Sequence, residues 1–225
     1  MNDSLGDRMK KYEAVYDQKL TPNSCLFIRV DGKAFHTFTR GSEKPFDSRI
    51  MNAMTEAAED TANEMQGFKL AYVQSDECTF MLGDYDTPQT EGWFGYRLNK
   101  VVSIAAAMYS VHFNHRYNQY RDDVNLANPA YFDARAFIVP KDDAPNVFVW
   151  RQQDWARNSI QMLAQSKFSH KQLHGKNTND IHEMLHDIGV NWTKDCSARE
   201  RNGTFITPHK LFHNKLDYDL IKALI

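Results

Sequence analysis

The chain has 225 residues, enough for one large domain, and its 27 basic and 29 acidic side chains give a formal net charge of −2. Hydrophobic residues make up 42% of the sequence and charged residues 25%, a composition that supports a buried core and excludes disorder throughout. The near-neutral charge excludes a uniformly basic nucleic-acid-binding protein of the histone kind. It leaves room for a local basic patch on an enzyme that acts on nucleic acids.

The expected elements of the first 140 residues follow from apolar residues at helical spacing and from short β-branched runs bounded by glycine, proline or aspartate. In chain order they are a charged helix over residues 1–20, a strand over 25–30, a helix from Asp47 or Ser48 to about 65, strands over 70–74 and 77–82, a turn-rich segment over 83–92, a helix over 93–117 and a strand over 132–139. The two central strands are joined by a tight turn at Ser75-Asp76.

This order of strand, helix, strand, strand, helix, strand predicts an α+β fold with a ferredoxin-like antiparallel sheet and both helices on one face. A fragment of a parallel sheet has a similar order, but the tight turn favours antiparallel pairing. Residues 1–140 are expected to form this sheet domain. Residues 141–225 are expected to form a mostly helical extension packed on it, with helices over 150–165 and 182–188, so that the two parts make one structural unit.

The cysteines and the amino-terminal residues indicate a cytoplasmic protein without a membrane partner. Cys25, Cys78 and Cys196 are too few and too widely spaced for a disulfide framework or a paired-cysteine zinc site. The first residues carry no apolar signal segment, and the longest apolar stretch, residues 101–113, is shorter than the ~20 residues that a membrane span needs.

Three carboxylates are expected to meet at one edge of the sheet. In a ferredoxin-like sheet the first and third strands are antiparallel neighbours, which places Asp31 beside Asp76 and Glu77. Unpaired carboxylates at this separation repel one another, and hard oxygen ligands next to Gly32 suit Mg²⁺. Each residue taken alone is better explained as an ordinary turn residue. Their pairing by topology favours a metal site of the kind used in two-metal phosphoryl transfer.

Four sequence blocks resemble the tRNA(His) guanylyltransferase family. They are Ile28-Arg29-Val30-Asp31-Gly32-Lys33-Ala34-Phe35-His36, Lys44-Pro45-Phe46-Asp47, Gln74-Ser75-Asp76-Glu77 and Trp150-Arg151-Gln152-Gln153-Asp154. The resemblance covers residues 20–165 well and the tail weakly. It implies a fold like the palm domain of polymerases and an enzyme that adds nucleotides to the 5′ end of tRNA in the 3′-to-5′ direction.

The resemblance also implies the residues of the site. Two Mg²⁺ ions would be held by Asp31, the Gly32 carbonyl and Asp76, and the catalytic residues would be Asp31, Asp76, Glu77 and Lys44. The implied nucleotide-binding residues are Arg29, Asp31, Gly32, Lys33, Ala34, Phe35, His36, Ser75, Asp76, Arg97, Lys100 and Asn158. For His36 a structural role is the alternative, and for Arg97, Lys100 and Asn158 simple exposure on a helix surface is the alternative.

The implied substrates are ATP, GTP or another nucleoside triphosphate, and a tRNA. A 5′-monophosphorylated tRNA would first be adenylylated by ATP, and the 3′-hydroxyl of the incoming nucleotide would then expel AMP. Ala156 stands where the eukaryotic enzymes carry a histidine, and Lys33 and Ala34 replace their Arg and Asn. The chain therefore looks like the guanylyltransferase-like proteins of bacteria, archaea and phages, which tend to repair truncated tRNAs with a template. The family also implies a homotetramer.

A basic run without acidic residues offers a further contact with tRNA phosphates. Lys167, Lys171 and Lys176 are the expected contacts, although a charge run is more often a solvated face. Two other functions stay open from the residues alone. One is a different palm-type two-metal enzyme, such as a nucleotide cyclase. The other is a non-catalytic RNA-binding module, which would normally carry aromatic residues on its central strands.

Overall fold

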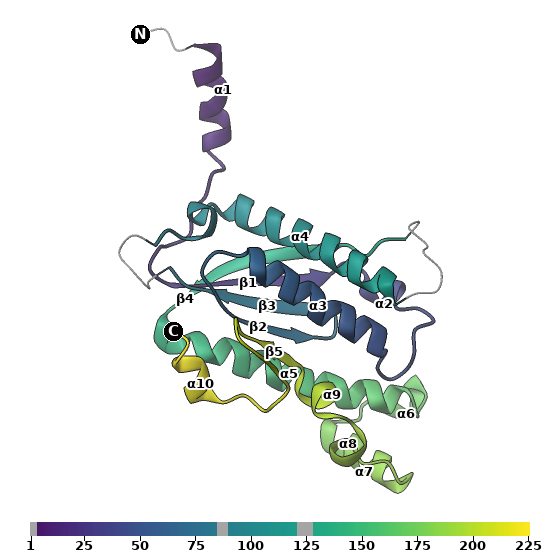
Figure 1. Cartoon of the computed structure of the whole chain (residues 1–225). Helices are drawn as coiled ribbons and strands as arrows, with labels where there is room; N and C mark the ends of the chain where they lie inside the picture. The colour runs from purple at the N-terminus through teal and green to yellow at the C-terminus, as the bar shows by residue number, and fades with distance from the viewer. Residues whose placement is uncertain (1–3, 85–89, 121–127) are drawn as a thin grey trace.

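The computed structural model describes residues 4–84, 90–120 and 128–225 and contains one antiparallel sheet packed against helices (Figure 1). Within these residues the sheet has six strands in the order β4-β1-β3-β2-β5-β6, and all neighbours are antiparallel. The strands are β1 (Cys25–Gly32), β2 (Phe68–Gln74), β3 (Glu77–Leu82), β4 (Phe132–Val139), β5 (Thr204–Ile206) and β6 (Leu211–Phe212).

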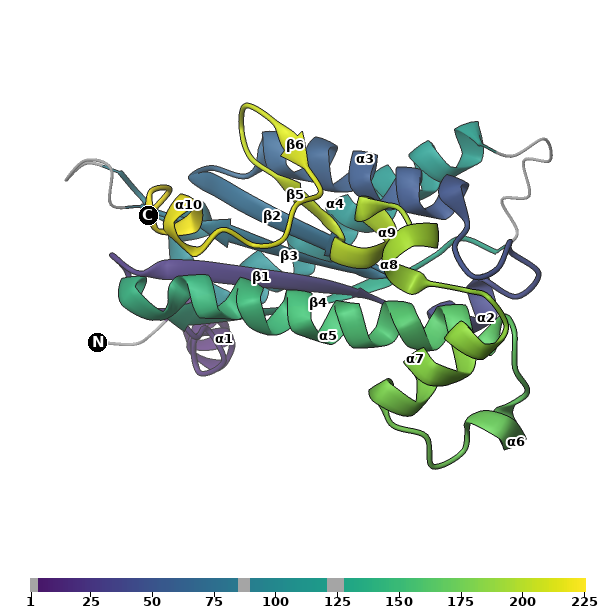
Figure 2. The same ribbon diagram turned by 90° about the horizontal axis from the view of Figure 1, so that it is seen from below.

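Helices cover both faces of the sheet. The described helices are α1 (Leu5–Ala14), α2 (Phe35–Phe38), α3 (Ser48–Glu64), η1 (Trp93–Tyr96), α4 (Leu98–Gln119), η2 (Lys141–Asp143), α5 (Ala144–Gln165), α6 (His170–Leu173), α7 (Thr178–Asp187), α8 (Trp192–Asp195), α9 (Ala198–Asn202) and α10 (Tyr218–Lys222). Helices α3 and α4 lie on one face, whereas α5 lies along the other (Figure 2). In the described ranges, every helix is too short or too polar to traverse a bilayer.

The alternation of side chains along β1 explains the two layers. Ile28 and its alternate neighbours pack with Met54 of α3 and Tyr109 of α4 in one buried cluster. Phe27 faces the opposite side and packs with Phe148 of α5 in a second cluster. The α+β, palm-like class is confirmed, with β1 and β3 as antiparallel neighbours.

The carboxy-terminal part enters the sheet, a feature that the sequence pattern did not predict. β5 pairs with β2, and β6 pairs with β5, so the sheet continues past the expected boundary at residue 140. These strands have three and two residues, too few to show a period. The structure also begins α5 at residue 144 rather than at 150, because Pro145 sits in its first turn, where proline is tolerated.

Other boundaries shift by a few residues. α1 ends at residue 14, α4 begins at 98 after a short 3₁₀ turn, and the helix expected over 182–188 is α7. Residues 85–89 of the expected turn-rich segment and residues 1–3 of the first helix lie outside the described residues.

Candidate active site

Asp31 and Asp76 lie near each other where β1 ends against the hairpin turn between β2 and β3. The register pairs Asp31 with Glu77, and the Gly32 N–H donates to the Asp76 carbonyl at 3.0 Å. A Cβ atom at Gly32 would lie 2.4 Å from Cδ2 of Phe35 and 3.1 Å from Cβ of Asp76. Glycine at position 32 therefore leaves the space that the Phe35 ring and, less closely, the Asp76 side chain occupy.

Both aspartates sit where a negative charge is unfavourable. Burial raises the pKa of Asp31, and the nearby carboxylate of Asp133 raises it further, while Arg135 at 3.9 Å partly opposes this. Burial also raises the pKa of Asp76; a hydrogen bond from Ser75 lowers it, and the Asp31 charge raises it again. A bound cation would relieve this repulsion, and carboxylate and carbonyl oxygens are the donors that Mg²⁺ prefers.

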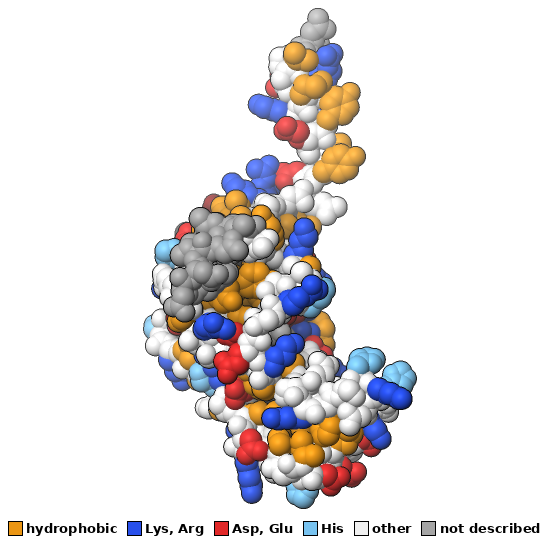
Figure 3. Space-filling model, turned by 90° about the vertical axis from the view of Figure 1, so that its right-hand side faces the viewer, with side chains coloured by type: hydrophobic (Ala, Val, Ile, Leu, Met, Phe, Trp, Pro, Cys, Tyr) orange, Lys and Arg blue, Asp and Glu red, His pale blue; other side chains and the backbone are white. Residues whose placement is uncertain are grey.

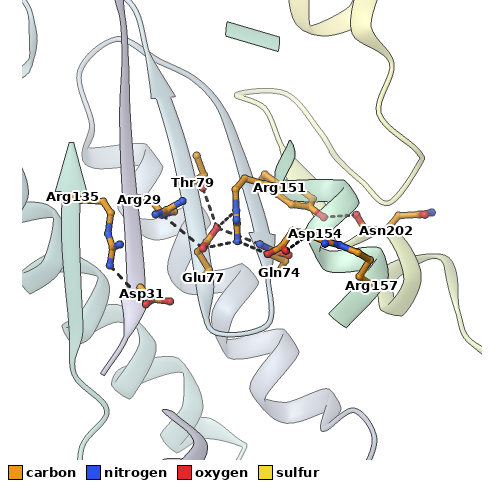
Figure 4. A network of polar contacts seen from close by, with 11 residues as sticks. Arg29, Asp31, Gln74, Glu77, Thr79, Arg135, Arg151, Asp154, Arg157 and Asn202 are labelled. Carbon is orange, nitrogen blue, oxygen red and sulfur yellow. Dashed lines mark hydrogen bonds and ion pairs between the residues drawn. The ribbon is translucent and has the colours of Figure 1, made fainter. Parts of the chain in front are cut away.

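Glu77 has a cationic partner of its own. Its carboxylate accepts from Nε and Nη2 of Arg151 at 2.7 and 2.8 Å, and Nε of Arg29 lies 3.8 Å away (Figure 4). The described residues hold no group of three or more His, Cys, Asp or Glu side chains arranged to share a metal ion. The structure thus places Glu77 in a buried ion pair, and the auxiliary catalytic role expected for it stays a prediction.

A cavity of about 460 Å³, a size within the range of small-molecule sites, opens beside Asp76 and Gly32, and Asp31 is not among the residues that line it. It is formed by the end of β2, the loop before α3, the first turns of α3, and parts of α5 and α9. The expected site residues that line it are Gly32, Ala34, Phe35, His36, Lys44, Ser75 and Asp76.

Sequence reasoning missed other cavity residues because they come from distant segments. Trp155 lies on α5, directly after the fourth block of the family resemblance. Arg199 comes from α9 and ties the tail to α3 by donating to Asn52 Oδ1 at 2.6 Å and to the Met51 carbonyl at 2.5 Å. Burial lowers the pKa of Arg199, which has no acidic partner within 4.0 Å among the described residues. Its position in the tail, where the resemblance is weak, gave no signal.

Several expected nucleotide contacts are not brought to this cavity. Arg97 binds Asp17 at 2.7 Å, and Lys100 lies over the ring of Phe94, both at the start of α4. The cavity is next to α2, which contacts the far end of α4 through Tyr117. About 20 helical residues, or roughly 30 Å, separate the two places. The structure therefore places Arg97 and Lys100 away from this cavity, and their contact with a nucleotide stays a prediction.

The remaining expected residues lie at the margin or on the surface. Asn158 is exposed on α5 and does not line the cavity. Arg29 and Lys33 lie under the rings of Trp150 and Tyr131 rather than in the cavity wall. Lys167, Lys171 and Lys176 are exposed around α6. This helix lies at the right-hand end of Figure 1, the side that Figure 3 views.

A family model described as tRNA(His) guanylyltransferase matches residues 6–140, which include both aspartates and the hairpin between β2 and β3. The chain belongs to the tRNA(His) guanylyltransferase family. This assigns it to the nucleotidyltransferases and confirms the resemblance drawn from the four blocks.

Similar proteins occur in viruses, fungi and animals. An uncharacterised protein of Acanthamoeba polyphaga mimivirus is 32% identical over 83% of this chain and 71% of its own length. The tRNA(His) guanylyltransferase of Schizosaccharomyces pombe is 30% identical over 92% of this chain and 81% of that protein. The chain spans about half the length of the mammalian relatives, 51% for the probable human enzyme.

Solved structures agree with the fold. A bacterial tRNA(His) guanylyltransferase-like protein in complex with ATP has a TM-score of 0.93 and 37% identity over 98% of this chain and 99% of that one. A second bacterial guanylyltransferase-like chain, in complex with GTP, has a TM-score of 0.82 and 31% identity over 98% of this chain and 99% of that one. The Saccharomyces cerevisiae enzyme, with 20% identity over 97% of this chain and 99% of that one and a TM-score of 0.83, shows the same fold.

Proposed function

We propose that the chain adds nucleotides to the 5′ end of tRNA in the 3′-to-5′ direction, with ATP and GTP or another nucleoside triphosphate as substrates. The single observation that carries this proposal is that the end of β1, with Asp31 and Gly32, lies against the Ser75-Asp76 turn, beside a cavity that Gly32 and Asp76 line. The bacterial relatives bound to ATP and to GTP, which share the fold over nearly their whole length, support it.

Two Mg²⁺ ions fit the residues at this edge. Asp31, Asp76 and the Gly32 carbonyl offer hard oxygen donors, and burial and mutual repulsion make the two charged carboxylates unfavourable without a cation. When bound, Mg²⁺ would neutralise phosphate oxygens and lower the pKa of an attacking hydroxyl. Two carboxylates and a close backbone oxygen are thus the proposed ligands.

The chain's own residues would position the reactants. Lys44 and His36 line the cavity and are the proposed phosphate contacts. A hydrogen bond from Ser75 lowers the pKa of Asp76 and so favours the charged carboxylate. A 5′-monophosphorylated tRNA would attack the α-phosphate of ATP and displace pyrophosphate, giving a 5′-adenylylated end, and the 3′-hydroxyl of the next nucleotide would then displace AMP. Both steps are phosphoryl displacements, in which positioning and charge neutralisation supply most of the catalysis.

The direct test uses a tRNA that lacks its first nucleotide and carries a ³²P-labelled 5′ phosphate. With Mg²⁺, ATP and GTP, the protein should yield an adenylylated intermediate and a product extended at the 5′ end. Asp76→Ala should give neither product, while Arg157→Met, a change on the exposed face of α5, should give both. Absence of both products with the unmodified chain contradicts the proposal.

The choice of nucleotide is proposed to follow the tRNA template. Ala156 on α5 replaces the eukaryotic histidine, and the bacterial guanylyltransferase-like chains match this structure closely. Extension of a truncated tRNA should incorporate the nucleotide complementary to the opposing base, and changing that base should change the nucleotide added. Exclusive addition of G to every tRNA would contradict a templated reaction.

A homotetramer is the proposed assembly, and the chain is proposed to act in the cytoplasm, where its three buried cysteine thiols would stay reduced. α1 buries none of its residues and projects from the body (Figure 1). Leu5, Met9, Tyr12 and Tyr16 are 44–75% exposed at helical spacing, which favours contact with another subunit. Light scattering after gel filtration would give the mass, and a monomer would contradict this assembly.

A further inference from the structure

Three exposed aromatic side chains lie outside the segment around α1 in the part of the chain that the structure describes. They are Tyr131, Trp150 and Tyr218, whose side chains are 59%, 49% and 39% exposed. Tyr131 precedes β4 and Trp150 lies on α5, and both border the strand end that carries Asp31. A single exposed ring needs no explanation, but two beside one site favour a partner that covers them.

The face of the sheet that α5 covers is open at the end of β1. Phe27 packs toward α5, so Arg29 and Asp31, at alternate positions along β1, face the same side. On the edge strand β4 the register places Arg135 beside Arg29 and Asp133 beside Asp31 (Figure 4). Asp31, Asp133 and Arg135 are 41%, 61% and 51% exposed, and they form an open strip between α5 and the edge of the sheet.

Trp150 borders the open strip from α5. The guanidinium carbons of Arg29 and Arg151 lie 5.4 and 4.7 Å from the centroid of its ring. Both arginines also flank the Glu77 carboxylate, so they meet the indole from the side of the sheet. The exposed part of the ring therefore faces away from the sheet, and two cations hold the ring in place.

Tyr131 borders the open strip at its other end. Its carbonyl accepts from the Lys33 N–H at 2.8 Å, and Nζ of Lys33 lies 6.0 Å from the centroid of its ring. Trp150 is thus over residue 29 and Tyr131 is beside residue 33, so the two rings are about 13 Å apart along β1 at 3.3 Å per residue. Asp31 lies midway between them.

We propose that Trp150 and Tyr131 stack on unpaired bases of the RNA substrate. Exposed aromatic rings with cations nearby are platforms for single-stranded RNA, because every base has a face on which a ring can stack. Bases within a duplex already stack on their neighbours. In a tRNA the unpaired 3′-terminal nucleotides begin beside the 5′ end, so these are the bases assigned to the two rings.

This inference rests on the proposed function, which brings the 5′ end of tRNA to Asp31. Neither ring lines the cavity beside Asp76, so these contacts are separate from those of the nucleoside triphosphate. The open strip between the rings is charged, whereas the centre of an interface between subunits is depleted of charged residues. RNA therefore fits this surface better than a second copy of the chain does.

The test compares two RNA hairpins with the same acceptor stem and a 5′ monophosphate, one with an unpaired 3′ overhang and one blunt. In fluorescence polarisation the unmodified protein should bind the overhang RNA at least ten-fold more tightly. Trp150→Ala and Tyr131→Ala should each weaken binding of the overhang RNA about five- to ten-fold and leave binding of the blunt RNA unchanged. Trp150→Phe, which keeps a ring, should retain most of the affinity.

Tyr218→Ala is the matched control, because Tyr218 lies beyond the other end of β4, where its hydroxyl donates to the Asp142 carbonyl at 3.4 Å. This variant should bind both hairpins normally. A second readout needs no variant: 2-aminopurine placed in the overhang should lose fluorescence when the unmodified protein binds, since stacking quenches it. Circular dichroism would show that each variant is folded.

Equal affinity of the unmodified protein for the two hairpins overturns the proposal. An equal loss for both hairpins in Trp150→Ala would place the rings against the helix end, and a lower mass in light scattering would place them in a subunit interface; either result also overturns it. Extension of tRNA is measured in parallel. Extension without an effect of the overhang defeats only this inference, whereas an effect of the overhang without extension defeats only the proposed function.

Discussion

Replacing Arg151 by methionine removes the cation that holds Glu77 and leaves that carboxylate buried. The two side chains are only 10% and 12% exposed and share two hydrogen bonds of 2.7 and 2.8 Å. Breaking a buried pair by removing one partner costs about 3–5 kcal/mol. Arg29, 3.8 Å from the same carboxylate, remains as a weaker partner, so we expect a loss at the lower end, about 3 kcal/mol.

Urea unfolding followed by circular dichroism measures this loss, and thermal unfolding should show a midpoint lower by about 6–12 °C for a chain of this size. Changing Glu77 to glutamine in the same chain should recover about 2 kcal/mol, because the unpaired charge is gone. Arg157→Met is the matched control: this side chain is 65% exposed and binds Asp154 at 2.8 Å, so its loss should cost no more than about 0.5 kcal/mol. A cost below about 1 kcal/mol for Arg151→Met would refute the reasoning.

Three further changes test the edge of the sheet and the basic segment. Gly32→Ala should destabilise the fold by about 1–3 kcal/mol, because its Cβ would overlap Phe35, and should slow 5′ extension about a hundred-fold; near-normal stability in urea would contradict the close approach. Burial raises the pKa of Asp76, so the folded chain keeps the carboxyl proton to a higher pH than the unfolded chain does. Stability therefore falls as the pH rises from the pKa of the unfolded chain to that of the folded chain. Asp76→Asn, neutral throughout, should therefore unfold at a higher temperature at neutral pH in EDTA while losing 5′ extension; an unchanged or lower midpoint would count against the buried charge. Replacing Lys171 and Lys176 by alanine should lower the slope of log binding constant against log salt by about 0.8 per lysine in mobility-shift titrations with tRNA, and an unaltered slope would return both residues to the solvated surface.

Much of the fold could be predicted because its elements carry local signals. The strand ending at Asp31 and Gly32, the helix capped by Asp47 and the hairpin at Ser75-Asp76 each have a regular pattern or turn residues, and all three are where they were expected. The side chain of Asp47 accepts from the Arg49 N–H as a helix cap should. β5 and β6 were missed because such short strands are stabilised by pairing with β2 rather than by their own pattern.

The sequence by itself was enough to propose Asp31, Gly32 and Asp76 as site residues and to identify the family, because each of these signals lies within a short continuous block. Only the tertiary structure decided the partners of those residues. Glu77 and Arg151 are 74 positions apart, and no local pattern shows that the carboxylate expected at the metal site is held by a guanidinium. Gln74 and Trp155 are also buried, because contacts between distant segments, rather than residue type, set how deeply a polar side chain lies in the fold.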